Sequence, residues 1–533
     1  MRTTNPDLSR RSFITRATGA ITLPLVLNGL PLQAFDGPLV NDLFNANVET
    51  DRVLVLIQLN GGNDGLNTVI PLDTYSAYQK LRSNIAIPTD KVLKLRDEAG
   101  LHPAMTGVHR LWSEQKVGVI HGVTYPNPNQ SHFRSNDIWM SGSSSNVNEP
   151  TGWVGRYLNT QYPTYPEGYP NAAMPDPIAI QMSAVVGLAL TGLQRQSMGI
   201  ALQDPEAFYR LVSGSDEPGT DVPSTAYAAS NVRYVREVQS KSMQFSTVIK
   251  AAADKAKNIA EYPTNNRLAD QLKIVARLIA GGLKTRVYVV QLNGFDTHAA
   301  QVDAQNSTIG AHALLLQLVS DAVAAFQSDI EQLGAGDRVV SMTFSEFGRR
   351  AASNQSLGTD HGTAAPLFFF GVPVEHGIVG SNPDLENLDN GNLRMQHDFR
   401  QIYASVLQQW FGADPGVTRS VLFDQFSTVK VIKGGTTSVT DYATSDGSVQ
   451  CDAPYPNPVR DIASLRMIVS QQQHVRMDVF DARGFHVTTL TNGVHDAGEH
   501  TLTFDAAQLP SGSYHVQVRA RGEVLHRVVV VAR

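Results

Sequence analysis

Hydrophobic positions follow two patterns along this chain, and the change from one to the other divides it. Near-continuous apolar runs occupy 51–59, 287–292, 339–344 and 366–371, and such runs are typical of strands covered on both faces. Helices are predicted between and after them, over 74–81, 131–142, 227–260, 266–283, 310–333 and 398–411. This alternation predicts an α/β sheet with helices on both faces and parallel crossover connections.

Beyond residue 425 the pattern becomes short and alternating. A Ser/Thr/Gly-rich linker is expected over 426–449, and strands are then predicted at 464–470, 474–480, 485–490, 498–505, 512–520 and 523–531. Strands at this spacing favour a small all-β, immunoglobulin-like sandwich over 450–533. The preceding α/β domain is expected over 45–425. Within it, 143–225 is rich in Pro, Gly, Tyr and Ser, and we interpret it as a cap or insertion over the site rather than as sheet.

The N-terminal residues 1–35 are interpreted as an export signal. Arg10 and Arg11 precede an apolar stretch, 17–35, which Pro24 and Pro31 interrupt, so it fits a twin-arginine signal better than a membrane span. A basic tail beside a helix is the alternative. No later segment is expected to span a membrane, and export by way of the periplasm is predicted.

Charge and cysteine content exclude several classes of function. The formal net charge is −6 without a long basic run, so no nucleic acid partner is expected. Cys451 is the single cysteine, which excludes a disulfide framework within the chain and any zinc site with several cysteines.

Four polar clusters lie at the ends of the predicted strands. Gly61–Gly65, Asp296–His298 and Ser345–Arg349 each follow an apolar run, and Asp360–Gly362 precedes one. Ligands of open α/β sheets bind beyond the carboxyl ends of the strands. Carboxylates and imidazoles gathered there would form a site for divalent metal ions, as a metal-dependent hydrolase needs. The candidate ligands are Asp64, Asp296, His298, Glu346, Asp360 and His361.

Each candidate also has a structural interpretation. Asp64 could simply form a turn, Asp296 could cap a helix, and Glu346 could pair with Arg349 three residues on. If the functional interpretation holds, Arg349 would clamp an anionic group of the substrate.

Ser131 is the candidate nucleophile, because the start of the helix at 131–142 favours bound phosphate or sulfate. An ordinary N-cap serine is the alternative, and Ser135 is the second choice. His132 is a ligand, an acid or a bystander, and His121 and His312 are further candidates for the same rim.

The C-terminal segment resembles the sorting domain of the bacterial type IX secretion system. The resemblance rests on Tyr455-Pro456-Asn457-Pro458 and on the segments 479–484 and 509–514. It implies that this unit is recognised by the export and type IX secretion machinery and that the protein is secreted or held at the cell surface.

The body, 51–412, resembles the DUF1501 family, whose fold is similar to the alkaline phosphatase and sulfatase superfamily. The motifs that carry the resemblance are 59–65, 129–133, 296–298, 345–349, 358–362 and 398–400. The resemblance implies an alkaline-phosphatase-like sheet with two divalent metals, whether zinc, magnesium, calcium or manganese, around a hydroxyl or thiol nucleophile. In chain order, the implied ligands are Asp64, Asp296 with His298, Glu346, and His361 with Asp360.

Two departures from the superfamily pattern leave a one-metal or degenerate site open. Asp296 and His298 are two residues apart, where several relatives space the pair by four, and the third strand is followed by Ser-Glu-Phe-Gly rather than Asp-His-Gly. The expected function is an exported metal-dependent hydrolase that acts on an anionic phosphate or sulfate ester. The alternative is a non-catalytic surface or carbohydrate-binding protein that keeps the fold.

Overall fold

A computed structural model describes residues 51–205, 245–435, 449–451, 454–481, 486–520 and 523–532, with the two-residue strands β1 (Val26–Leu27) and β2 (Leu30–Pro31). The Arg10–Arg11 signal lies outside these residues. So do most of the predicted linker and the part of the 227–260 helix before residue 245.

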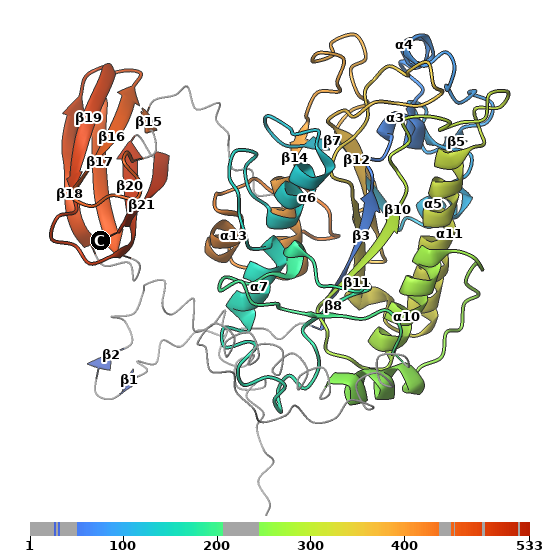
Figure 1. Ribbon diagram of the computed structural model, residues 1–533, viewed down its shortest axis with the longest axis horizontal. Coiled ribbons are helices and arrows are strands. Elements are labelled where there is room, and N and C mark those ends of the chain that lie inside the picture. The colour runs from blue at the N-terminus through green and yellow to red at the C-terminus, as the bar shows by residue number, and fades with distance from the viewer. Residues whose placement is uncertain are drawn as a thin grey trace, which may run out of the picture.

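A nine-stranded mixed sheet forms the centre of the α/β body, with the order β13-β7-β12-β11-β3-β10-β8-β9 and β14 paired to β7 (Figure 1). The strands are β3 (Val53–Asn60), β7 (Val117–Thr124), β8 (Ala179–Gln181), β9 (Ile200–Ala201), β10 (Val287–Asn293), β11 (Val339–Phe344), β12 (Ala365–Phe370), β13 (Gly377–Val379) and β14 (His397–Asp398). β10 and β11 both pair in parallel with β3, which lies between them.

Strand β12 is antiparallel to its neighbours, and its direction determines which of its two flanking loops lies at the rim of the sheet. It pairs antiparallel with both β11 and β7. Its first residue therefore lies at the edge where β3, β7, β10 and β11 end. The loop that precedes β12 and the loops that follow the other four strands consequently share one rim.

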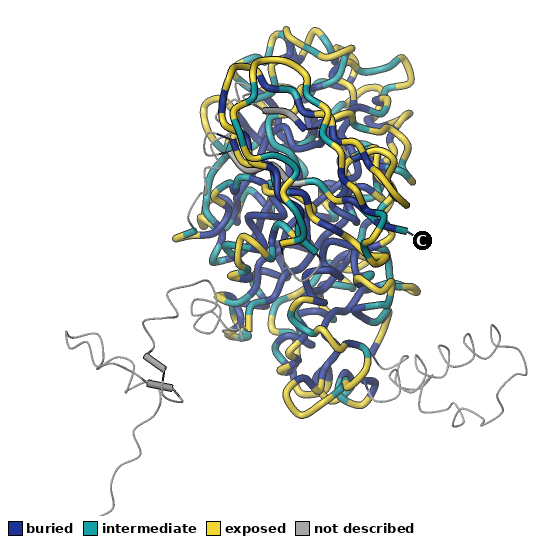
Figure 2. Tube along the Cα trace, turned by 90° about the vertical axis from the view of Figure 1, so that its left-hand side faces the viewer, coloured by how far each residue is buried: buried dark blue, intermediate teal, exposed yellow. Residues whose placement is uncertain are grey.

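Helices cover both faces of the sheet, which confirms the predicted fold class. Val55 and Ile57 of β3 face one core cluster, and Leu54 and Leu56 face the other. The first cluster includes α5 (Thr106–Ser113), α10 (Arg267–Ala280) and α11 (Ala311–Gln332). The second includes α6 (His132–Ser141), α7 (Trp153–Gln161), α12 (Phe399–Ser405), the π-helix η4 (Val406–Trp410) and α13 (Pro415–Leu422). Figure 2 shows the buried residues concentrated inside this body, with exposed positions in the loops.

Local sequence signals set the helix ends where they were predicted. The Asn266 side chain caps α10 by accepting from the backbone N–H groups of Leu268 and Ala269, both at 3.1 Å. Asp398 begins α12 with a capping box that Gln401 completes. Short elements complete the body: α3 (Gly65–Thr68), α4 (Tyr75–Leu81), the 3₁₀ turns η2 (Leu188–Leu190) and η3 (Gly336–Arg338), and a three-stranded sheet of β4 (Val69–Pro71), β5 (Leu93–Lys94) and β6 (Ala99–Leu101).

Helix α11 is long and apolar enough by composition to cross a membrane. However, 72% of its most apolar window is buried inside the protein. It packs against α5 and α10. These contacts are those of a core helix, and no other described helix has such a composition.

Two predictions for the body need correction. The segment 143–225 is not only a cap, because β8 pairs in parallel with β10 and β9 extends the same sheet. These strands are too short to produce a recognisable apolar run. The helix predicted over 227–260 ends at residue 255 in the described part, where the backbone turns so that the N–H groups of Ile259 and Ala260 can bind the Asp329 carboxylate.

The C-terminal strands form the predicted pair of antiparallel sheets, β15-β16-β19 and β18-β17-β20-β21. They are β15 (Val449–Cys451), β16 (Ile462–Val469), β17 (Gln473–Asp481), β18 (His486–His495), β19 (Gly498–Asp505), β20 (Gly512–Ala520) and β21 (Glu523–Val531). Alternate residues of β16 are buried, as expected for a strand with one covered face. The hydrophobic cluster of this unit contains only residues from 451 to 531.

Because that cluster includes no residue of the α/β body, we expect the body to fold without it. A variant that lacks 449–533 should unfold within about 2 °C of the body transition of the full chain, since its own core clusters are complete. Differential scanning calorimetry measures this. A fall of about 10 °C or more would show that the body depends on the C-terminal sheets.

Candidate metal centre at the sheet rim

Three potential metal ligands meet at the rim that β12 completes. His132 begins α6 after β7, Asp296 follows β10, and His361 precedes β12. One ligand atom from each lies within 4.8 Å of the other two, so the three form a group able to hold a metal ion. Asp296 keeps about half of its side chain exposed, at 47%, so the group opens to solvent.

His132 is oriented by Glu346, which is fully buried after β11. Nδ1 of His132 lies 2.8 Å from Oε1 of Glu346, and the same oxygen accepts from the Gly61 backbone N–H at 2.9 Å. Because this oxygen already accepts a hydrogen bond, Nδ1 of His132 is placed to donate to it, and in the neutral imidazole Nε2 then carries the lone pair. That Nε2 is buried without a hydrogen-bond partner and lies 3.4 Å from Oδ2 of Asp296.

His361 is fixed in the same sense by a backbone carbonyl. Its Nδ1 lies 2.8 Å from the carbonyl oxygen of Gln130, which can only accept, so Nε2 again carries the lone pair. Nε2 of His361 lies 3.2 Å from Oδ1 of Asp296. Two imidazole lone pairs thus face the two oxygens of one carboxylate. This arrangement is repulsive unless a cation lies between them or the imidazoles gain protons.

His298 and Asp360 lie beside this group rather than in it. Nε2 of His298 is 3.2 Å from Oδ1 of Asp296, and its Nδ1 is 3.5 Å from Oδ1 of Asp360. The hydrogen bond from Asn354, followed by contacts with His298, keeps the pKa of Asp360 below its usual value. Both side chains could approach a second cation at the exposed edge of the cluster.

The charge of Asp296 is held by its neighbours. Burial raises the pKa of its carboxyl, but the hydrogen bond and the positive charge of Arg349, together with the nearby His361, outweigh burial and lower the pKa to about 2. Burial lowers the pKa of His361, against the opposing effects of Asp296 and the Gln130 carbonyl. Ordinary conditions therefore favour an ionised Asp296 beside a neutral His361, the protonation states that bind a metal.

Arg349 does not have the position of an anion clamp, which corrects the prediction from sequence. Its side chain is fully buried, and its Nη2 donates to Oδ1 of Asp296 at 2.7 Å. Its remaining bonds go to backbone carbonyls of the other rim loops, at Gly61, Gly62, Phe295 and Thr359. Arg349 is a positioning residue that ties the loops together behind Asp296.

Asp64 is also placed differently from its predicted role. The structure does not bring it into the group of His132, Asp296 and His361. Its Oδ2 accepts from Arg82 and from Gln301, both at 2.6 Å, and the Arg82 and Asp64 side chains are fully buried. Burial raises the pKa of Asp64, but the Arg82 charge outweighs it and the net shift is downward. One atom, Oδ1, is buried without a partner.

The predicted nucleophiles differ in availability. Ser131 is the N-cap of α6 and is exposed, but its side chain makes no cap hydrogen bond. Ser135 is buried, contacts the Glu346 carbonyl oxygen and lies 2.8 Å from the Tyr125 hydroxyl, so its role is structural.

The two further rim histidines are buried outside the cluster. His121 lies within β7, and burial lowers its pKa to about 4. His312 bonds Asn63 at 3.0 Å in the Asp64 network, and burial lowers its pKa to about 4 as well.

Glycines allow the rim loops to approach one another closely. Gly61 has a φ of +127°, and a Cβ there would lie 2.3 Å from the backbone nitrogen of Asp296. A Cβ on Gly362 would lie 2.2 Å from the backbone carbon of Arg349. Real Cβ atoms do not come this close to backbone, so both positions require glycine for the rim to close.

Several residues of the site escaped the sequence analysis. The Phe347 ring lies 4.8 Å from His132 and 4.6 Å from His361, between centroids. Its place inside Ser-Glu-Phe-Gly-Arg was a usable signal. Arg82 and Gln301 gave no signal, because each lies in an ordinary segment far in sequence from Asp64.

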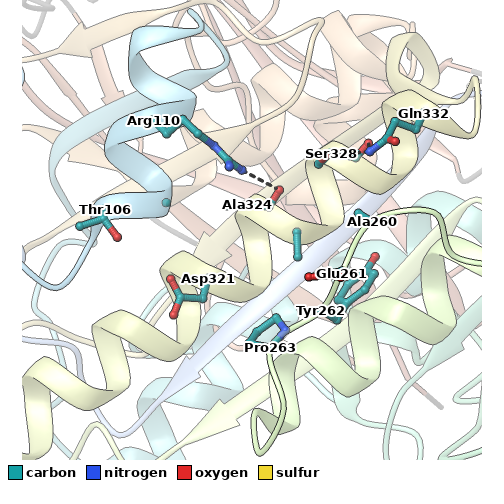
Figure 3. Close-up of a pocket in the computed structure, with 12 residues that line it drawn as sticks. Thr106, Arg110, Ala260, Glu261, Tyr262, Pro263, Asp321, Ala324, Ser328 and Gln332 are labelled. Carbon is teal, nitrogen blue, oxygen red and sulfur yellow. Dashed lines mark hydrogen bonds between the residues drawn. The ribbon is translucent and has the colours of Figure 1, made fainter.

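The candidate metal centre does not lie in the groove of about 750 Å³ that runs between α5, α11 and the segment 260–263. Figure 3 shows Arg110 reaching toward the Ala324 carbonyl across it, at 3.5 Å. Its lining residues include Glu261 and Asp321 but no member of the metal group.

Two family models match the chain. Residues 213–413 match "Protein of unknown function (DUF1501)", and residues 453–532 match "Secretion system C-terminal sorting domain". Both family resemblances are thus confirmed as matches over these residues. The DUF1501 match begins after the motifs at 59–65 and 129–133. No curated protein matches the chain.

The solved structures that match this chain are distant from it. A protein in the alkaline phosphatase superfamily from Vibrio parahaemolyticus is 8% identical, covers 85% of this chain and 79% of that one, and has a TM-score of 0.35. The PsFucS1 sulfatase from Pseudoalteromonas sp. is 9% identical over 88% and 86%, with a TM-score of 0.32. Latent PorU from Porphyromonas gingivalis is 16% identical over 16% of this chain, with a TM-score of 0.14, and the chain spans 10% of that protein.

The positioning role of Arg349 can be tested by measuring the free energy of unfolding of a variant that lacks its side chain. Replacing Arg349 by Ala leaves several buried carbonyl oxygens without a donor, so we expect a loss of at least about 2 kcal/mol in the free energy of unfolding. Chemical denaturation measures the loss. Arg350→Ala, at the exposed neighbouring position, is the control and should cost less than about 0.5 kcal/mol. Equal stability of both variants would contradict the positioning role.

Proposed function

We propose that the protein is a metal-dependent hydrolase of phosphate or sulfate esters, with its reaction centre at the rim. The observation that carries this proposal is the convergence of His132 and His361 on Asp296. Each imidazole is fixed so that its Nε2 lone pair faces a carboxylate oxygen. Backbone and Glu346 contacts hold this arrangement in place, although it would be repulsive without a cation.

The donor set fits a divalent metal ion. His132, Asp296 and His361 would hold it, and Glu346 behind His132 has the place of the carboxylate that often orients a histidine ligand. The buried, unpartnered atoms Nε2 of His132 and Oε2 of Glu346 also fit a cation near them. Imidazole and carboxylate ligands suit zinc or manganese better than magnesium or calcium, which prefer oxygen alone. When bound, such a metal polarises an ester oxygen and stabilises the negative charge that develops in the reaction.

His298 and Asp360 support a second, more exposed ion, with Asp296 shared between the two positions. Asp64 would join only if it exchanged Arg82 for a metal, and its buried ion pair opposes that exchange. The site therefore favours one firmly held ion.

Ser131 is the residue we propose as nucleophile. It precedes His132 directly, it is exposed at the N-terminus of α6, and its hydroxyl is not used as a cap. The α6 dipole and first-turn amides favour an anionic group at this end of the helix. In the reaction the Ser131 oxygen would form a bond to phosphorus or sulfur, the ester oxygen would leave with a proton, and water would then release Ser131.

The sorting domain indicates that the protein is secreted or displayed at the cell surface by the type IX machinery. We propose in addition that it reaches this machinery through the periplasm after export across the inner membrane. An anionic ester outside the cell would then be its substrate.

Metal content provides the first test of this function. Asp296→Ala removes the carboxylate that both histidines face, so bound metal and ester hydrolysis should fall together, each at least about tenfold. Metal is measured by mass spectrometry of the purified protein, and hydrolysis with nitrophenyl phosphate and sulfate. Asp303→Ala, an exposed aspartate beyond the rim, is the control. Normal metal content in Asp296→Ala would rule out this ligand set.

Ser131 provides the second test. Ser131→Ala should leave metal content unchanged and alter the free energy of unfolding by less than about 0.5 kcal/mol, because no cap hydrogen bond is lost. Turnover should fall at least about a thousandfold if the hydroxyl attacks the ester. Steady-state kinetics and thermal unfolding measure the two effects. Turnover near the parent rate would leave water as the attacking group.

A further inference from the structure

The most exposed large hydrophobic residue of the described chain lies beside the metal group. Phe133 follows His132 in the first turn of α6, and 86% of it is exposed. Single exposed hydrophobic residues are normal on protein surfaces, so exposure alone says little. Phe133 is of interest because of its position beside the candidate metal site.

The helix geometry places this ring. His132, Ser135 and Trp139 share the inward face of α6, and His132 meets Glu346 at the end of that face. Phe133 is rotated by about 100° from His132 around the helix axis. Asn136 lies three residues on, in the same strip of the helix as Phe133.

The contact of Asn136 shows which way that strip faces. Its Oδ1 accepts from Nε2 of Gln58 at 2.8 Å, and Gln58 is close to the end of β3. The strip therefore faces the part of the rim where β3 ends and where Asp296 follows the neighbouring β10. Phe133 lies in the same strip, about one turn nearer the start of α6, directly after His132, and 86% of it is exposed.

The other side of the site mouth is polar. The Gln130 carbonyl holds His361, and the Gln130 side chain donates to Oδ1 of Asn392 at 3.4 Å. Both amide side chains have exposed surface. An ester group at the metal site would thus have a flat apolar ring on one side of its leaving group and amides on the other.

We propose that Phe133 is a specificity-determining residue that stacks on a ring in the leaving group of the ester. This inference rests on the proposed function, since it assumes that the ester group binds at the metal cluster. The feature that Phe133 recognises is the face of a six-membered ring in the ligand, which either an aryl group or a sugar supplies. A linear leaving group of equal charge offers no such face.

The test uses pairs of phosphate esters with and without a ring. Phenyl phosphate is compared with propyl phosphate, and glucose 6-phosphate with sorbitol 6-phosphate, the reduced and acyclic analogue of the same sugar phosphate. Binding to the purified full chain is measured by calorimetry, and hydrolysis is measured in parallel. The corresponding phenyl and propyl sulfates extend the first pair.

Phe133→Ala should weaken binding of the ring member of at least one pair about fivefold and leave the linear member within about twofold. Phe133→Tyr, which keeps the ring, should bind like the parent, whereas Phe133→Leu should behave like the Ala variant. Tyr455→Ala, at a similarly exposed aromatic residue of the C-terminal unit, is the control and should change nothing. The pair that responds shows whether the ring is aryl or sugar.

The outcomes separate this inference from the proposed function. If ligands bind or react but Phe133→Ala affects ring and linear members equally, or affects neither, the stacking role is wrong while the hydrolase proposal stands. If none of the esters binds or reacts with the metal-replete parent protein, both proposals are overturned.

Discussion

The rim depends on one buried cation. Arg349 comes from the loop after β11, yet its guanidinium binds carbonyl oxygens in the loops after β3 and β10 and in the loop before β12. It also fixes Asp296, the residue on which both histidines converge. Burying a guanidinium is costly unless its donors are satisfied, so these carbonyls must stay in place. The same bonds that satisfy Arg349 therefore hold the candidate ligands in register.

The direction of β12 explains how His361 reaches this rim. Four strands deliver their following loops to the rim because they are parallel, whereas β12 delivers its preceding loop because it is antiparallel. The sequence placed Asp360 and His361 before an apolar run, but it did not show the direction of that run. The direction in which strands pair is decided by long-range packing. Short apolar runs of similar composition do not determine that direction.

The strong periodic elements were predictable, and the pairing of distant side chains was not. The bounds of α11 and the strands β19, β20 and β21 follow from periodicity and turn residues within each segment. The β8 and β9 strands escaped because two or three residues produce no period. In the site, Glu346 was found from its motif, but its position behind His132 was not. The ion pair between Arg82 and Asp64 could not be predicted, because neither segment contains a pattern that indicates the contact.

The close glycine contacts separate two kinds of sequence constraint. Gly61 and Gly362 are required by backbone approach alone, whatever chemistry the rim performs. His132 and His361 are not needed to close those contacts, so an evolutionary lineage could lose them and still fold. Among relatives, retention of these glycines would therefore indicate that the rim keeps its backbone structure. Retention of these histidines would indicate that the candidate metal centre is kept. A paralogue with these glycines and without these histidines would keep the fold but lack the proposed metal centre, and its sequence would show this.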